Sequence, residues 1–199
     1  DVPQVKDALE FVEMQDSSFY RLELRPQKTS NDGALYDYPG FTVFSSTARE
    51  STARMMRKLG YHSNNINSWK YTGSTLVMDS FFNLRYRVYK SDSVYNPYYR
   101  EIYTDDPVHV YRLDTALSPG FVADHGVELW STSANSPFQV QNQLVERALG
   151  RRGTFKHQAM EEITARNLRR ISGNAEGGYH YSPEDDGEKS ELTLEFTMP

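Results

Sequence analysis

The sequence predicts an α+β fold, with mixed layers of helices and strands over residues 1–150 and a β-rich C-terminal part over residues 151–199. Residues 5–14 repeat apolar side chains at helical spacing, and a second helix is marked over residues 137–149. Short segments such as 19–24 alternate polar and apolar residues, which is typical of strands. A chain of 199 residues is long enough for one large domain or two small ones.

The N-terminal segment is expected to run from a helix into a strand. The helix over residues 5–14 places its apolar side chains on one face. The strand over residues 19–24 should end at Arg25-Pro26, and a polar loop over 27–33 should follow. A second short strand is expected over residues 40–44, which are β-branched and aromatic.

Another helix, between the two already named, is predicted to begin at Thr47. Thr47 and Glu50 have the spacing of a capping box, in which each side chain binds a free amide of the first turn. Gly60 is suited to the residue that follows the helix. Residues 62–70 are polar and are interpreted as a loop.

The middle of the chain is predicted to be mostly extended. Residues 76–78 and 84–89 are interpreted as extended or buried segments, separated by a helical turn at 79–82. Residues 99–103 and 108–113 flank a turn that contains Asp106-Pro107. This arrangement indicates a β-hairpin.

The clearest helix signal begins at Ser136. Ser136 is a candidate N-cap, Pro137 stands at the first helical position and Gln139 completes a capping box. Gly150 should end this helix. A short strand is expected before it, over residues 121–123.

The last fifty residues change in character and are interpreted as a β-rich subdomain. Turn-forming residues cluster at 172–174 and 184–187. Residues 191–198 alternate strictly, with an apolar face made by Leu192, Leu194, Phe196 and Met198. The alternation runs to the end of the chain, which leaves open that this subdomain is truncated.

Composition excludes several classes of site. The chain has no cysteine, which removes disulfides, zinc–thiolate sites and cysteine nucleophiles. The mean hydropathy is -0.70 and no run of about 20 apolar residues occurs, so no membrane span is expected within the chain. No signal peptide is expected after Asp1. A net charge of -5 with scattered basic residues disfavours nucleic-acid binding.

No catalytic residue, metal site or cofactor is predicted. The five histidines have no metal-ligand spacing. Ser45 and Ser46 follow a strand and precede a helix, but the flanking glycines of a nucleophile elbow are missing. No pair of carboxylates and no triad stands out from the sequence.

Sugar contact is the one binding function that the aromatic residues indicate. Tyrosines are abundant and cluster around Asn96-Pro97, and their rings can stack on sugars or pack onto a sheet. Trp69 stands in a polar segment, which makes it a better candidate than Trp130. Asp79, among apolar residues, is either a helix N-cap or a contact to an acceptor or a metal ion. The candidate carbohydrate-binding residues are Trp69, Tyr71, Asp79, Tyr95, Tyr98 and Tyr99.

Several segments, in this order, resemble the YfhO family of bacterial multi-pass membrane proteins. Residues 38–47 are similar to a glycine-aromatic-Phe-Ser-Ser pattern, and residues 79–86 to an Asp-Ser-Leu-Leu-Gly segment followed by Lys-Tyr. Residues 135–144 are similar to a helix start of the form Pro-Phe-x-x-Gln-Asn-x-Leu. Asn83 departs from a common glycine and Ser136 is an insertion. The resemblance covers about residues 5–150.

The resemblance implies a soluble extracytoplasmic domain, on the extracellular face of the cell membrane, of a GT-C-type glycosyltransferase. Such a protein transfers sugar from a lipid-linked donor, for example to teichoic acid in Gram-positive bacteria. Its catalytic acid lies on a loop between membrane helices, so this chain is expected to be non-catalytic and to position the acceptor or cap the active site.

The partners implied are the transmembrane helices of the parent chain, and a cell-wall glycopolymer or a lipid-linked sugar. Two other functions are weighed against this one. The first is a non-catalytic module that binds wall polymers or a protein. The second is an independent hydrolase, which the lack of a carboxylate pair disfavours.

Overall fold

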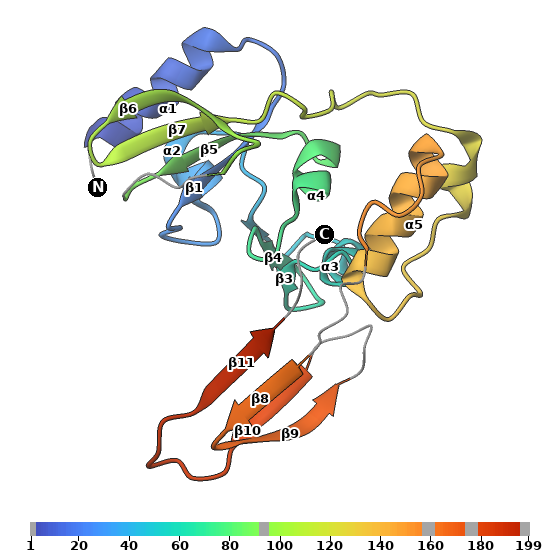
Figure 1. The fold of residues 1–199 in the computed structure, drawn as a ribbon. Helices are drawn as coiled ribbons and strands as arrows, with labels where there is room; N and C mark the ends of the chain where they lie inside the picture. The colour runs from blue at the N-terminus through green and yellow to red at the C-terminus, as the bar shows by residue number, and fades with distance from the viewer. Residues whose placement is uncertain (1–2, 92–95, 157–161, 174–178, 196–199) are drawn as a thin grey trace. The chain divides into compact units, whose positions relative to one another are not determined.

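The computed structural model describes residues 3–91, 96–156, 162–173 and 179–195 (Figure 1). The chain divides into two compact units, residues 1–123 and residues 124–199. Helices and sheets are mixed in the first unit, and the C-terminal part is rich in strands, so the predicted α+β class is confirmed. The domain boundary predicted at residue 150 lies inside the second unit, directly after a helix that ends at Leu149. It stays a prediction.

A four-stranded sheet forms the centre of the first unit. Its strands lie in the order β1 (Arg21–Arg25), β5 (Leu84–Tyr89), β7 (Val108–Arg112) and β6 (Arg100–Asp105). The pair β1 and β5 is parallel, whereas β7 is antiparallel to both of its neighbours. The hairpin predicted from the turn at Asp106-Pro107 is confirmed as β6 and β7.

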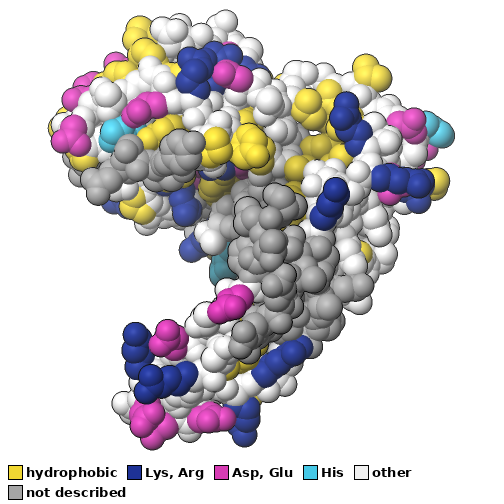
Figure 2. Space-filling model, viewed as in Figure 1, with side chains coloured by type: hydrophobic (Ala, Val, Ile, Leu, Met, Phe, Trp, Pro, Cys, Tyr) yellow, Lys and Arg dark blue, Asp and Glu magenta, His cyan; other side chains and the backbone are white. Residues whose placement is uncertain are grey.

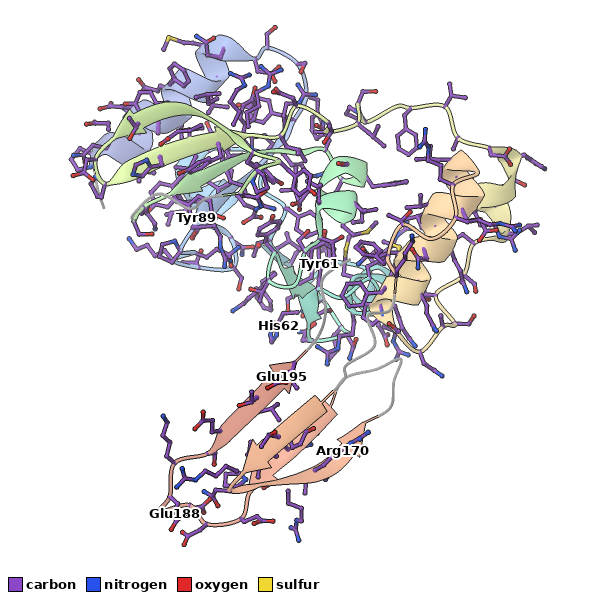
Figure 3. All side chains as sticks on the ribbon, in the orientation of Figure 1. Tyr61, His62, Tyr89, Arg170, Glu188 and Glu195 are labelled. Atoms are coloured by element: carbon purple, nitrogen blue, oxygen red, sulfur yellow. The ribbon has the colours of Figure 1, made fainter. Side chains whose placement is uncertain are left out.

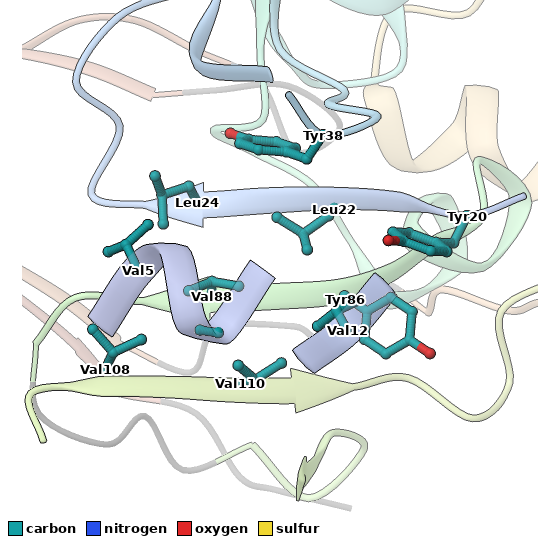
Figure 4. Packing of buried hydrophobic residues seen from close by; sticks show 11 residues of the cluster. Val5, Val12, Tyr20, Leu22, Leu24, Tyr38, Tyr86, Val88, Val108 and Val110 are labelled. Carbon is teal, nitrogen blue, oxygen red and sulfur yellow. The ribbon is translucent and has the colours of Figure 1, made fainter. Parts of the chain in front are cut away.

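Helix α1 (Pro3–Gln15) covers one face of this sheet (Figure 4). Val5 and Val12 of the helix pack against side chains from three strands, among them Leu22, Val88 and Val110. These five residues are 0–3% exposed. Burying each such side chain contributes about 1.5–3 kcal/mol, so this layer is the main apolar core of the unit.

A smaller antiparallel sheet lies in the order β2 (Val43–Phe44), β4 (Ser68–Lys70) and β3 (His62–Ser63). The prediction of a loop over residues 62–70 is therefore wrong. The side chain of Asn64 makes the turn between β3 and β4, because its Oδ1 accepts three successive backbone N–H groups at 3.0 Å. Tyr61, just before β3, is buried and its neighbour His62 is exposed (Figure 3).

Three short helices complete the first unit: α2 (Asp32–Tyr36), α3 (Glu50–Lys58) and α4 (Leu76–Phe81). Sequence reasoning missed α2 and placed the first turn of α4 in an extended segment. The capping box at Thr47 is also wrong, because α3 begins after Arg49 without a side-chain cap. The Thr47 hydroxyl instead lies 2.9 Å from that of Ser45 in the preceding turn.

The second unit combines a helical part with paired strands. Its elements are η1 (His125–Leu129), α5 (Pro137–Leu149), β8 (Glu162–Arg166), β9 (Leu168–Gly173), β10 (Tyr179–Pro183) and β11 (Glu191–Glu195). Strand β9 pairs with β10, and β8 pairs with β11, both antiparallel. The β-rich tail is thus confirmed.

The bounds of α5 agree with the prediction, but its N-terminal capping does not. Pro137 is at the first helical position, and Gly150 follows the helix with φ of 66°. Ser136 has the extended backbone of an N-cap, yet its side chain makes no capping hydrogen bond. No strand forms over residues 121–123, which is a second correction.

The strands of the tail are held by a turn at Asn167. Asn167 has φ of 50°, and its side-chain amide donates to the carbonyl oxygens of Asp185 and Glu188 at 2.8 and 2.9 Å. Leu192 and Leu194 of β11 are 39% and 46% exposed. Phe196 and Met198, predicted on the same face, lie outside the described residues. Figure 2 shows acidic and basic side chains interleaved over these strands.

Candidate functional site

Asp79 is a carboxylate of the first unit that is fully enclosed, with 0% of its surface exposed. Helix α4 places it there. The Thr75 side chain caps this helix by accepting from the backbone N–H of Met78 at 3.3 Å, and the backbone N–H of Asp79 donates to the Thr75 carbonyl oxygen at 2.9 Å. The N-cap role weighed for Asp79 therefore belongs to Thr75.

Four side chains bind the Asp79 carboxylate. The Ser74 hydroxyl donates to Oδ1 at 2.6 Å. The hydroxyl groups of Tyr99 and Tyr71 donate to Oδ2 at 2.6 and 3.0 Å, and the Arg87 guanidinium forms an ion pair with the same oxygen. Charge-assisted hydrogen bonds of this kind are stronger than neutral ones, so these contacts fix the position of the Asp79 side chain firmly.

Arg87 is enclosed by the same two tyrosine rings. Its guanidinium carbon lies 4.0 Å from the ring centre of Tyr99 and 5.0 Å from that of Tyr71, which is cation–π geometry. Burial by itself lowers the pKa of Arg87, but Tyr71, Asp79 and Tyr99 together raise this pKa above its usual value. Burial, followed by the charge of Asp79, raises the pKa of both tyrosines, which keeps them protonated donors.

This arrangement is suited to holding the unit together. A general acid or base must reach a proton of its substrate, whereas the Asp79 side chain is 0% exposed and is bound by four protein side chains. The network joins α4 to β5 and to the segment before β6. We define it as the Asp79 network, made of Tyr71, Ser74, Asp79, Arg87 and Tyr99.

Glu23 is a second buried carboxylate, on strand β1 beside Arg87 of strand β5. It is 1% exposed, and its Oε1 accepts the backbone N–H groups of Phe41 and Thr42 at 2.9 and 2.5 Å. Gln27 donates to Oε2 at 2.8 Å. Burial raises the pKa of Glu23, and these hydrogen bonds only partly oppose the rise.

The structure brings three of the six predicted sugar-binding residues together. Tyr71, Asp79 and Tyr99 meet in the Asp79 network, where they are 6%, 0% and 8% exposed. Trp69 lies in β4, half-buried, and its indole N–H donates to the Phe41 carbonyl oxygen at 2.9 Å.

The remaining predicted residues belong to the tyrosine-rich segment around Pro97. Tyr98 is 64% exposed, and Tyr95 lies outside the described residues. Sugar contact by these six residues stays a prediction.

An open, polar cavity of about 650 Å³ lies in the second unit. Its volume is in the range of ligand sites in proteins. The loop before α5 and the exposed face of α5 form its walls. The lining side chains include Trp130, Ser131, Gln143, Glu146, Arg147 and Arg152. We call this cavity the Trp130 pocket.

Backbone contacts fix the walls of the Trp130 pocket. The indole N–H of Trp130 donates to the Val140 carbonyl oxygen at 3.1 Å. The backbone N–H of Asp124 donates to the Ala148 carbonyl oxygen at 2.8 Å. A Cβ atom on Gly126 would lie 3.3 Å from the backbone carbonyl oxygen of Arg147. Glycine at position 126 therefore permits the close approach of the loop to α5.

The side chains of this pocket suit a ligand rich in hydroxyl groups. An indole ring offers a flat apolar surface for the face of a sugar, while amide, guanidinium and carboxylate groups bind its hydroxyls. Arg152 donates to Glu146 at 2.6 Å, which orients both side chains at one wall. From the sequence, Trp69 was preferred over Trp130 as a sugar-binding residue. The sequence feature that could have indicated this pocket is the position of Trp130 shortly before a helix whose polar residues 143, 146 and 147 share one face.

Within the described ranges, no group of three or more His, Asp or Glu residues is placed to hold a metal ion. The same part of the chain contains no helix with both the length and the apolar character needed to cross a bilayer.

Comparison with known proteins identifies one family. The family described as "Bacterial membrane protein YfhO" matches residues 2–199, which includes the last fifty residues, where the sequence alone showed little resemblance. No curated protein and no solved structure matches the chain.

Proposed function

Because the chain belongs to the YfhO family of bacterial membrane proteins, we propose that it is an extracytoplasmic domain that positions a cell-surface glycopolymer for a membrane glycosyltransferase. In this proposal the membrane part of the parent protein transfers the sugar. The chain described here holds the acceptor polymer, such as a teichoic acid, and takes no chemical step itself.

The Trp130 pocket is the observation that carries this proposal. It is open, it has a volume of about 650 Å³, and its aromatic and polar side chains match the two kinds of surface that a sugar presents. Arg147 can bind an anionic link of the polymer, while the paired Arg152 and Glu146 can bind sugar hydroxyls.

The Asp79 network supports the non-catalytic part of the proposal. Its carboxylate is the one that sequence reasoning singled out, and it is engaged by four protein side chains. A group held in this way stabilises the fold and has no open side toward a substrate.

A fluorescence titration tests the proposal, because the chain has only two tryptophans. In a Trp69→Phe variant, Trp130 is the sole indole reporter. We expect its emission to change as glycerol-phosphate or glycosylated teichoic-acid fragments are added. The single variant Trp130→Phe is the matched control. Its remaining tryptophan is Trp69, whose emission should not change.

Affinity measurements complete the test. Trp130→Ala should weaken polymer binding about tenfold or more, as removal of a central aromatic contact does. The proposal is wrong if Trp130→Ala leaves binding unchanged, or if none of the polymers binds the 199-residue chain.

A module that only binds wall polymer would use the same pocket. Sugar transfer by the full-length membrane protein separates the two functions. We expect Trp130→Ala to lower the transfer rate at limiting acceptor and to leave it nearly unchanged at saturating acceptor. An unchanged rate at both concentrations would favour the module that only binds.

A further inference from the structure

Two neighbouring hollows of the first unit have opposite chemistry. The first, about 400 Å³, is lined by the positively charged Arg25, Lys28 and Lys70 together with the hydroxyl groups of Thr29, Ser30 and Thr72. We call it the cationic pocket. The second, about 600 Å³, shares Thr29 and Ser30 with it and is lined further by Leu35 and Phe44. We call it the apolar groove.

The cationic pocket has an unusual charge for a chain whose net charge is -5. The described side chains that line it include no carboxylate. The nearby Asp32 is 3% exposed. Its carboxylate accepts hydrogen bonds from the backbone N–H groups of Lys28 and Thr29 at 2.7 Å each. The Lys70 ammonium group makes no ion pair within the part of the chain that the structure describes.

The walls of both hollows belong to one framework. Gln27 is anchored to Glu23 at 2.8 Å, and the backbone N–H of Phe44 donates to the Asn31 side chain at 2.9 Å. Phe44 and Lys70 lie on neighbouring strands of the small sheet, β2 and β4. The backbone segments that bear the cations and the apolar side chains are therefore joined to one another.

The apolar groove exposes two large side chains beside these charges. Leu35 is 56% exposed and Phe44 is 52% exposed. Single exposed apolar residues are common on protein surfaces, but here two of them adjoin a pocket with three positive charges. Amphipathic helices that lie on anionic membranes combine basic residues with leucine and phenylalanine, and this surface brings the same residue types together.

We propose that the cationic pocket and the apolar groove together form a membrane-contact site for an anionic phospholipid. The phosphate group occupies the pocket, where Arg25 and Lys70 supply the charge and the hydroxyl groups of Ser30 and Thr72 supply hydrogen bonds. Leu35 and Phe44 rest in the interfacial layer beside it. This inference concerns a different unit and a different ligand from the Trp130 pocket, and it does not rest on the proposed function.

Vesicle sedimentation with the 199-residue chain tests the site. We expect the chain to partition onto phosphatidylcholine vesicles that contain phosphatidylglycerol, and not onto pure phosphatidylcholine. Binding should weaken with added salt, since salt screens exposed charges. Trp130→Ala should leave this partitioning unchanged, which separates the result from that of the polymer titration.

Matched variants separate the two halves of the site. Lys70→Gln should weaken partitioning about fivefold, the effect of one basic residue near an anionic surface. Leu35→Ser/Phe44→Ser should weaken it about tenfold or more. Lys58→Gln and Met14→Ser, which remove a charge and an exposed apolar side chain elsewhere in the unit, should have little effect. Thermal unfolding of each variant confirms that it is folded.

Two outcomes overturn the inference. If the site variants and the control variants partition equally, these hollows do not contact the membrane. If soluble glycerol phosphate displaces the chain from vesicles as well as a short-chain phosphatidylglycerol does, the pocket is a site for free phosphate esters, and the lipid contact is wrong.

Discussion

At the scale of single residues, the first unit depends on charges that are removed from water. Asp79 and Arg87 are paired with side-chain exposures of 0% and 13%. Desolvation of both groups is costly, and it is offset only while each has its partner and its hydrogen bonds. The tyrosines complete this environment, because their hydroxyls bind the carboxylate and their rings cover the guanidinium.

Removing Asp79 should therefore destabilise the protein strongly. We expect Asp79→Ala to lower the free energy of unfolding by about 3–5 kcal/mol, because Arg87 is left buried without its counter-charge. Urea denaturation followed by circular dichroism measures the change. Asp114→Ala is the matched control: its ion pairs with Arg100 and Arg112 join side chains that are 42–60% exposed, and their loss should cost about 1 kcal/mol or less. Equal effects of the two substitutions would refute this account of the Asp79 network.

Glu23 should make stability fall as the pH rises. Burial raises its folded-state pKa above the value of 4.5 expected in the unfolded chain. The folded state then holds a proton more tightly, so this contribution is fully present below pH 4.5 and is lost as the pH rises through the folded pKa. Glu23→Gln should remove this part of the pH dependence. Denaturation midpoints of both proteins from pH 4 to 8 test the sign, and parallel curves would show that Glu23 does not titrate on folding.

At the scale of elements, one glycine allows two segments of the first unit to pack closely against each other. Gly73 follows β4 and has φ of 93°, which non-glycine residues rarely adopt. A Cβ atom at this position would collide with the carbonyl oxygen of Gly60, which follows α3. The end of α3 and the segment before α4 can therefore approach only while residue 73 is glycine.

Gly73→Ala should cost about 2 kcal/mol or more in unfolding free energy, from backbone strain and the collision together. Gly120→Ala is the control, because a Cβ atom there meets nothing within 4 Å. The midpoints of thermal unfolding compare the two variants. A Gly73→Ala protein as stable as Gly120→Ala would show that the approach of these segments is not needed.

Elements with strong periodic patterns could be predicted from the sequence. The repeat in α1, the hairpin of β6 and β7, and the proline and glycine at the ends of α5 each depend on local chemistry. Residues 62–70 could not be assigned in this way. Their strands depend on the turn that the Asn64 side chain makes and on pairing with β2, which is distant in sequence.

The candidate site was predictable only in part. Asp79, Tyr71 and Tyr99 were singled out by residue type, and they do meet. Their burial could not be predicted, because it depends on Arg87, a residue of strand β5 that gave no sequence signal of its own. The Trp130 pocket was missed for a similar reason, since its walls combine a loop with one face of α5.

At the scale of the whole molecule, the two proposed binding sites belong to different units. The described part of the first unit contains the apolar core, the Asp79 network and the proposed lipid contact. The described part of the second unit contains the Trp130 pocket and the paired strands of the tail. Both units belong to the sequence that the membrane-protein family matches.

Cysteine labelling in intact bacteria tests most directly whether the Trp130 pocket faces the cell exterior and holds polymer there. The chain has no cysteine of its own, so single reporters can be introduced at Val122, which is 96% exposed, and at Ser133 in the pocket. They are placed in a full-length parent protein from which other cysteines are removed. With a membrane-impermeant maleimide, the account predicts rapid labelling of Val122→Cys and slow labelling of Ser133→Cys, which becomes equally fast in the purified chain. Labelling only after lysis, or equal rates in intact cells, would contradict it.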